Sequence, residues 1–99
     1  MRLSQKSQVI LAAAFNEADQ SADVYVFGSR VDDSALGGDI DLLVHSSVID
    51  KAQLRKIKWA LMERLGEQKI DILVSKNLDE PFVRLILPKA ILLKGPKRT

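Results

Sequence analysis

The chain has 99 residues, of which 46% are hydrophobic and 28% are charged, and it contains no cysteine. These values are typical of one ordinary globular domain, and they exclude a disulfide framework or a thiolate metal site. Lys94, Lys97 and Arg98 supply three of the 15 basic residues, which leaves 12 basic against 13 acidic residues in the rest of the chain. This near-neutral body and an aromatic content of 5% argue against a nucleic-acid binder.

Short apolar runs alternate with amphipathic segments along the first half of the chain. Apolar residues at 11, 14, 15 and 18 have helical spacing, which predicts a helix over 4–20. Residues 24–27 are β-branched or aromatic and predict a buried strand. A loop over 30–38 and a second strand over 39–45 are expected to follow. No run is long enough to cross a bilayer, and the N-terminus lacks the hydrophobic core of a signal peptide, which predicts a cytoplasmic protein.

The second half continues the alternation. Asp50 is a predicted N-cap for a helix that ends at Gly66, with an apolar stripe at Leu54, Ile57, Leu61 and Leu65. Residues 69–74 predict a third strand. Asp79 is expected to cap a last helix, with Pro81 in its first turn and Pro88 at its end. Residues 90–93 are either a final short strand or an apolar segment tucked against the body. The predicted organisation is one domain over 1–94 and a basic flexible tail over 95–99.

Two carboxylates open the second strand, shortly after a glycine-serine turn. Asp39 and Asp41 point to the same side of a strand, because strand residues alternate between faces. Two like charges there repel each other, and hard oxygen ligands in this arrangement suit Mg²⁺. Gly28 lets backbone N–H groups approach a phosphate, and Ser29 adds a hydroxyl donor.

This pattern resembles the nucleotidyltransferase superfamily that includes DNA polymerase beta. More narrowly, it is similar to minimal nucleotidyltransferase (MNT) proteins, many of which are antitoxins encoded beside a HEPN-domain toxin. Those proteins combine Gly-Ser, a loop of about ten residues, Asp-apolar-Asp and a later third carboxylate, for which Asp71 is the simplest match. The loop is one residue shorter here, and Gly37-Gly38 replaces a serine that often precedes the first aspartate. The resemblance implies a nucleotidyltransferase fold.

The order of the elements provides a separate test of this resemblance. A helix connects the second and third strands, so these strands should be parallel and should bring Asp71 to the end of the sheet that holds Asp39 and Asp41. The Gly28-Ser29 turn reaches that end only if the first strand is antiparallel to the second. The predicted fold class is therefore α/β (α+β): a small mixed sheet of three to four strands, with helices packed on one face.

Three carboxylates can hold two divalent ions about 3.5–4 Å apart, as two-metal phosphoryl-transfer sites do. Asp39 and Asp41 are predicted to share two Mg²⁺ ions, and Asp71 to complete the ion that activates an acceptor hydroxyl. That hydroxyl would attack the α-phosphate of a nucleoside triphosphate. Gly28 and Ser29 would hold the terminal phosphates, and Arg30 would balance charge on the leaving pyrophosphate, although a plain surface role for Arg30 remains open.

The acceptor is expected to be a macromolecule, because so small a domain has little surface left for an acceptor pocket. Resemblance to the MNT antitoxins implies AMP transfer from ATP to a hydroxyl, such as that of a tyrosine, on a HEPN-type toxin. The alternative is a module without catalysis that neutralises a toxin by covering its active site.

Other residues keep two interpretations. His45 is interpreted as structural. Trp59 either flanks the core or anchors an interface. The basic residues of the middle helix form either a solvated face or a docking surface for an acidic partner; they are Lys51, Arg55, Lys56 and Lys58. Apolar residues near the C-terminus suggest a homo-oligomer as a further option; they are Phe82, Leu85, Ile86 and residues 90–93.

Overall fold

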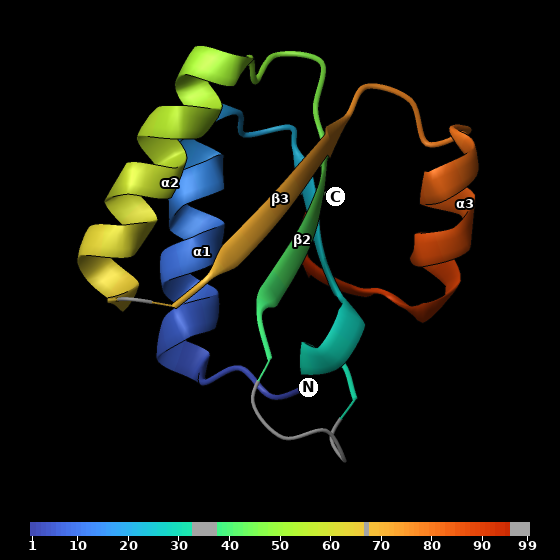
Figure 1. Cartoon of the computed structure of the whole chain (residues 1–99). Helices are drawn as coiled ribbons and strands as arrows, with labels where there is room; N and C mark the ends of the chain where they lie inside the picture. The colour runs from blue at the N-terminus through green and yellow to red at the C-terminus, as the bar shows by residue number, and fades with distance from the viewer. Residues whose placement is uncertain (33–37, 67, 96–99) are drawn as a thin grey trace.

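The computed structural model describes residues 1–32, 38–66 and 68–95. Within these ranges the predicted order of elements is confirmed, with bounds that shift by one or two residues (Figure 1). Residues 33–37 of the predicted loop and 96–99 of the predicted tail lie outside the described residues. The elements are α1 (Gln5–Ala18), β1 (Asp23–Phe27), the 3-10 turn η1 (Gly28–Arg30), β2 (Ile40–His45), α2 (Lys51–Leu65), β3 (Ile70–Ser75), α3 (Pro81–Ile86), the 3-10 turn η2 (Leu87–Lys89) and β4 (Ile91–Lys94).

The four strands form one mixed sheet in the order β3-β2-β1-β4. β1 is antiparallel to both β2 and β4, whereas β2 and β3 are parallel. The parallel pair is connected through α2, as a crossover requires. This topology confirms the predicted fold class, and the segment over 90–93 is resolved in favour of a strand.

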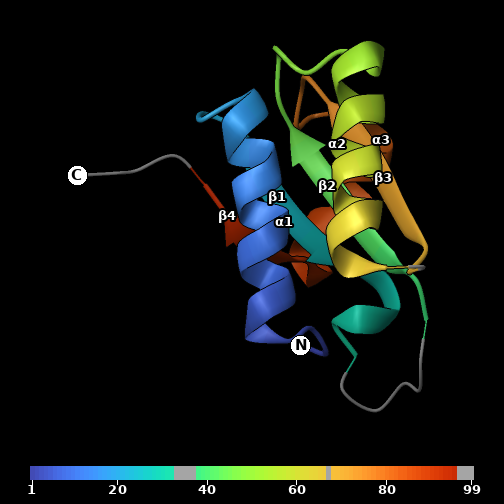
Figure 2. The same cartoon turned by 90° about the vertical axis from the view of Figure 1, so that its left-hand side faces the viewer.

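The main core lies between the sheet and the pair α1 and α2. Alternate residues of β2 point into it, so Ile40, Leu42 and Val44 are fully buried in the same cluster as Leu11 and Phe15 of α1. Figure 2 shows the two helices running side by side over this face of the sheet. The carboxylates of β2 therefore belong to the other face.

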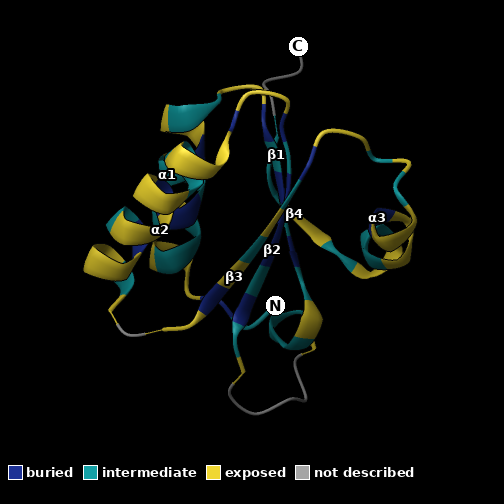
Figure 3. Ribbon diagram, turned by 45° about the horizontal axis from the view of Figure 1, so that its top comes forward, coloured by how far each residue is buried: buried dark blue, intermediate teal, exposed yellow. Residues whose placement is uncertain are grey.

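The third helix departs from the predicted arrangement of all helices on one face. In Figure 3, α3 lies on the side of the sheet opposite α1 and α2. Leu43 of β2 points away from the main core yet is completely buried, and Val83 of α3 is equally buried without belonging to the main core cluster. Because β2 is apolar on both faces beyond Asp41, its second face needs a cover, and α3 lies on that side.

The ends of the helices follow from local side chains. Asp50 Oδ1 accepts from the Gln53 backbone N–H at 2.8 Å, and Gln53 Oε1 accepts from the Asp50 backbone N–H at 3.1 Å, so a capping box starts α2. Gly66 ends the helix as predicted, with a φ of 78°. The N-cap of α3 is Glu80 rather than the predicted Asp79, whose backbone N–H instead bonds to the Asn77 side chain.

Two further sequence expectations find a place in the fold. His45 Nδ1 lies 3.6 Å from Asp23 Oδ2, at the far end of β2 from Asp41, which agrees with a structural role. Among the described helices, none combines the length and the apolar composition that a membrane crossing demands.

Candidate functional site

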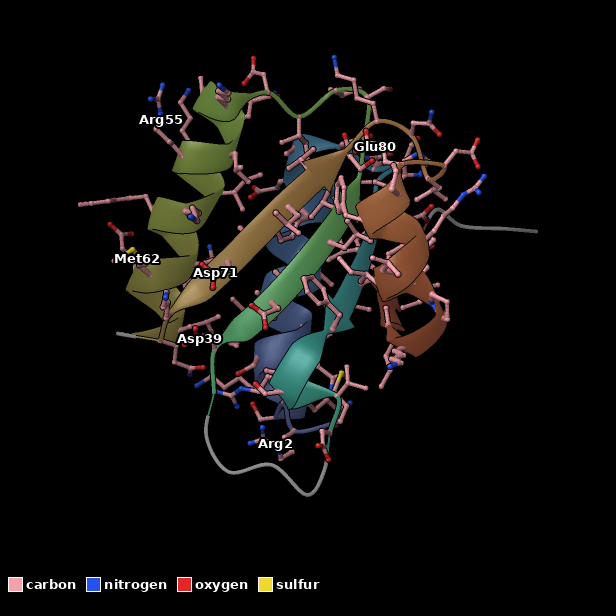
Figure 4. All side chains as sticks on the ribbon, turned by 45° about the vertical axis from the view of Figure 1, so that its right-hand side comes forward. Arg2, Asp39, Arg55, Met62, Asp71 and Glu80 are labelled. Carbon is pink, nitrogen blue, oxygen red and sulfur yellow. The ribbon has the colours of Figure 1, made fainter. Side chains whose placement is uncertain are left out.

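One end of the sheet gathers the residues that the sequence pattern singled out. β2 and β3 are in register, so Asp41 is paired with Asp71 across the parallel strands. In the antiparallel pair, Asp41 faces Phe27, the residue directly before the Gly28–Arg30 turn. Figure 4 shows Asp39 and Asp71 at the starts of their strands and Arg2 at the same end of the molecule. The predicted convergence of Asp41, Asp71 and the turn is present in the strand register.

Gly28 packs directly on the Asp41 carboxylate. Its φ is +75°, a conformation that residues with a Cβ rarely adopt. A Cβ added there would also collide with Asp41 Oδ2. Gly28 is thus needed twice, for its backbone conformation and for the space it leaves, and the turn lies against an acid.

Ser29 is held in turn by the residue that precedes the first acid. Gly38 has a φ of +100°, and a Cβ at this position would collide with Ser29 Oγ. The Ser29 hydroxyl donates to the backbone of Asp39, the residue after Gly38, with Oγ 3.5 Å from the Asp39 carbonyl oxygen. The second glycine of the Gly-Gly pair therefore makes room for Ser29, while Gly37 lies outside the described residues.

The site carries concentrated negative charge. Burial raises the pKa of the Asp41 carboxyl above its ordinary value, and the neighbouring charges of Asp71 and then Asp39 raise it further, while Lys69 lowers it. Both other acids therefore act on Asp41 through space. Repulsion of this kind is relieved by a cation placed among the carboxylates.

In the structure, Lys69 partly supplies that positive charge. Its Nζ lies 3.6 Å from Asp39 Oδ2, and both side chains are substantially exposed. Within residues 1–32, 38–66 and 68–95, no group of three acidic or histidine side chains is arranged closely enough to hold a metal ion. The charge and the oxygen donors fit a divalent cation, but joint chelation by all three aspartates remains a prediction.

Arg30 faces the N-terminal segment. Its Nη1 donates to the Arg2 carbonyl oxygen at 3.0 Å, and its Nε is buried without a hydrogen-bond partner among the described residues. These contacts give Arg30 a structural role, and its predicted contact with a leaving pyrophosphate remains a prediction.

Arg2 is the residue that sequence reasoning missed. Its Nη2 donates to the Ser29 carbonyl oxygen at 2.7 Å, its Nε to the Asp32 carbonyl oxygen at 3.0 Å, and its backbone N–H to the Arg30 carbonyl oxygen at 2.7 Å. These bonds hold the backbone carbonyl groups of the turn, and they place the Arg2 guanidinium against them. No local sequence signal marks this contact, because it joins residues that lie 27 to 30 positions apart.

The Gly28-Ser29 turn therefore packs on Asp41, whose neighbour in the parallel pair of strands is Asp71. The model of the family "Polymerase beta, Nucleotidyltransferase" matches residues 10–99, so the chain belongs to this nucleotidyltransferase family. No curated protein matches the chain.

The Gly28 contact predicts a specific effect of Gly28→Ala. We expect the added methyl group to displace the Asp41 carboxylate from its partly buried position, so that its pKa falls back toward 3.8. Carbon-detected NMR titration of the Asp41 carboxyl measures this. Gly66→Ala is the matched control, because Gly66 also has a positive φ but a Cβ there would meet nothing within 4 Å. Strain should destabilise both variants by about 1–3 kcal/mol, and an unchanged Asp41 titration in Gly28→Ala would contradict the contact.

The raised pKa of Asp41 predicts that its charge destabilises the fold. The folded state binds the Asp41 proton more tightly than the unfolded state, so stability is lost as pH rises through the folded pKa. We therefore expect Asp41→Asn to be more stable than the wild type at pH 7 without metal. The difference should shrink toward zero as pH falls below 3.8, the ordinary value. Urea unfolding across this range measures it, and a variant less stable at pH 7 would refute the prediction.

The Arg2 contacts predict that this residue stabilises the turn. Arg2→Ala should cost about 1.5–3 kcal/mol, the range for hydrogen bonds from a charged donor. Hydrogen exchange of the Val31 and Asp32 amides, which bond to the carbonyls of Gly28 and Ser29, should speed up in parallel. The control is Arg84→Ala, because the Arg84 side chain is 71% exposed and should contribute within about 0.5 kcal/mol. If Arg2→Ala and Arg84→Ala lowered the free energy of unfolding equally, the prediction that Arg2 stabilises the turn would be contradicted.

Proposed function

We propose that the protein transfers AMP from ATP to a hydroxyl group on a protein partner. The single observation that supports this most is the packing of the Gly28-Ser29 turn on Asp41, whose strand partner is Asp71. A phosphate bound at the turn would lie beside the acids that a phosphoryl-transfer site needs. Nucleotidyltransferase-type activity follows from the family itself, and the nucleotide and the acceptor are our proposal.

The turn and the acids would bind different parts of the substrate and its metal. The Gly28 and Ser29 backbone and the Ser29 hydroxyl would bind the terminal phosphates, and Arg2 fixes the turn from behind. Asp39, Asp41 and Asp71 would hold Mg²⁺, as members of the family generally use a divalent metal with a nucleoside triphosphate. When bound, Mg²⁺ supplies charge neutralisation at the reacting phosphate and activation of the attacking hydroxyl.

The acceptor proposed is a protein, in particular a HEPN-type toxin in a toxin-antitoxin pair. Resemblance to the MNT proteins supports it, as does the small size of the domain, which leaves the acceptor to be presented by another molecule. A cytoplasmic location is part of the same proposal.

A second candidate is neutralisation of a toxin by covering it without chemistry. The observation that favours this candidate is the arrangement of the acids, since the described residues hold no group of three ready to bind a metal and Lys69 pairs with Asp39. The two candidates differ in whether the carboxylates are needed.

The test is transfer of label from α-phosphate-labelled ATP, with Mg²⁺ and the product of the adjacent gene as acceptor. We expect the wild type to label the acceptor and Asp39→Asn with Asp41→Asn to lose at least about 100-fold in rate, as loss of charge stabilisation does elsewhere. Asp79→Asn is the matched control, because its side chain is 80% exposed in the loop before α3. If the Asp39 and Asp41 double variant neutralises the toxin without labelling it, occlusion is established instead. Absence of label with the wild-type protein would refute the transfer reaction.

A further inference from the structure

One side of α2 carries basic and apolar residues that the transfer site does not use. Four positions with helical spacing lie on this side, and Trp59 flanks them. We call these residues the α2 outer face: Lys51, Arg55, Lys58, Trp59 and Met62, all of which are exposed. The opposite side of the helix provides Ile57 and Leu61 to the core. Figure 4 shows Arg55 and Met62 along this outer side, with Met62 toward the end that holds Asp71 and Asp39.

Two large apolar side chains of this face are left in solvent. Trp59 is 67% exposed and Met62 is 54% exposed. Together with Glu63 they line a hollow of about 220 Å³. Neither side chain contributes to the core. A tryptophan side chain left in solvent is unfavourable for a monomer. Tryptophan is also the side chain most enriched among residues that dominate protein interfaces. Its exposure therefore argues against the core as the place of Trp59, and an interface role is part of the proposal below.

The α2 outer face continues to the transfer site. A larger hollow of about 370 Å³ lies between α2 and the start of β3, lined by Lys58, Met62, Gln68, Lys69 and Ile70. Lys69 belongs both to this hollow and to the site, because its Nζ lies 3.6 Å from Asp39 Oδ2. A molecule bound here would lie beside the carboxylates.

The charge of the surface specifies its partner. Lys51, Arg55 and Lys58 of the face and Lys69 of the hollow are all cations. Glu63 is the only acid within α2, and Asp39 lies beside Lys69. A partner with exposed acids satisfies these cations, and an apolar side chain on it fills the hollow at Met62. Single-stranded nucleic acid would need several stacking aromatics, and this face offers one.

We propose that the α2 outer face and the adjoining hollow dock the acceptor protein through an acidic surface that carries an apolar side chain. This inference rests on the proposed transfer to a protein. Docking next to Lys69 positions the acceptor hydroxyl at the carboxylates, so that the partner provides the acceptor site that the small domain lacks. Trp59 and Met62 supply the apolar contact, and the basic residues supply orientation and a fast, salt-sensitive association.

Calorimetric titration with the product of the adjacent gene tests the apolar contact. We expect Trp59→Ser with Met62→Ser to weaken binding at least about tenfold. The matched control is Val9→Ser with Leu85→Ser, which removes residues that are 62% and 79% exposed elsewhere on the surface and should leave Kd unchanged. Label transfer by the Trp59 and Met62 variant should recover at saturating partner, because docking affects KM rather than kcat.

A second pair of variants tests the charges. Arg55→Glu with Lys58→Glu should weaken binding about tenfold at low salt and flatten its salt dependence, because it removes two cations and adds two acids. Lys6→Glu with Lys89→Glu makes the same change in charge at exposed positions outside α2 and should have little effect.

The outcomes separate this proposal from the transfer reaction. Wild-type affinity in the Trp59 and Met62 variant, or equal losses in the Val9 and Leu85 control, would overturn docking on α2. Conversion of a wild-type dimer to a monomer by the same variant would assign the face to a second copy of the chain and also overturn it. Partner binding that depends on α2 without any transfer of label would support docking and refute only the reaction. No binding to the wild type would overturn both.

Discussion

The close approach of Gly28 to the Asp41 carboxylate is the contact on which the candidate site depends. It forms because β1 ends where β2 begins, and the antiparallel register places Phe27 opposite Asp41. The chain must then turn away without a side chain, since a Cβ would occupy the space of the Asp41 oxygen. The Gly28-Ser29 turn after β1 and Asp41 on β2 are thereby fixed relative to each other by backbone geometry.

Charge is the cost of this arrangement. Asp41 is partly buried against Gly28 and is acted on by Asp71 and Asp39, so its pKa is raised above the ordinary value. The main core lies on the other face of the sheet and supplies the stability that lets the acids remain together. Lys69 offsets part of the repulsion from an exposed position, which can be exchanged for another cation with little loss of packing. The repulsion among the acids is therefore only partly offset in the structure.

The sequence predicted those parts of the structure that depend on local periodicity. Alternation along β2 and β3 and the helical crossover between them are enough to bring Asp41 beside Asp71, and both signals lie within short segments. The position of α3 could not be predicted in this way, because alternation places Leu43 on the face opposite the main core but does not show which segment lies on that face. The Arg2 contact with Ser29 joins distant segments and leaves no mark in either. The sequence likewise could not show that Arg30 turns toward the Arg2 backbone.

The helix α2 links the transfer site to its proposed partner. Its length provides the crossover that makes β2 and β3 parallel, and its inner side closes the core through Ile57 and Leu61. Because both roles use only the inner side, the outer side is free to vary without loss of the fold. Solubility alone would favour charged residues throughout that side, as at Lys51 and Arg55, and would disfavour Trp59 and Met62. Their exposure next to the hollow at Lys69 is explained if a second molecule covers them, and the same contact would place that molecule beside Asp39. In the proposed arrangement the same helix that sets the register of Asp41 and Asp71 also carries the surface on which a partner would dock.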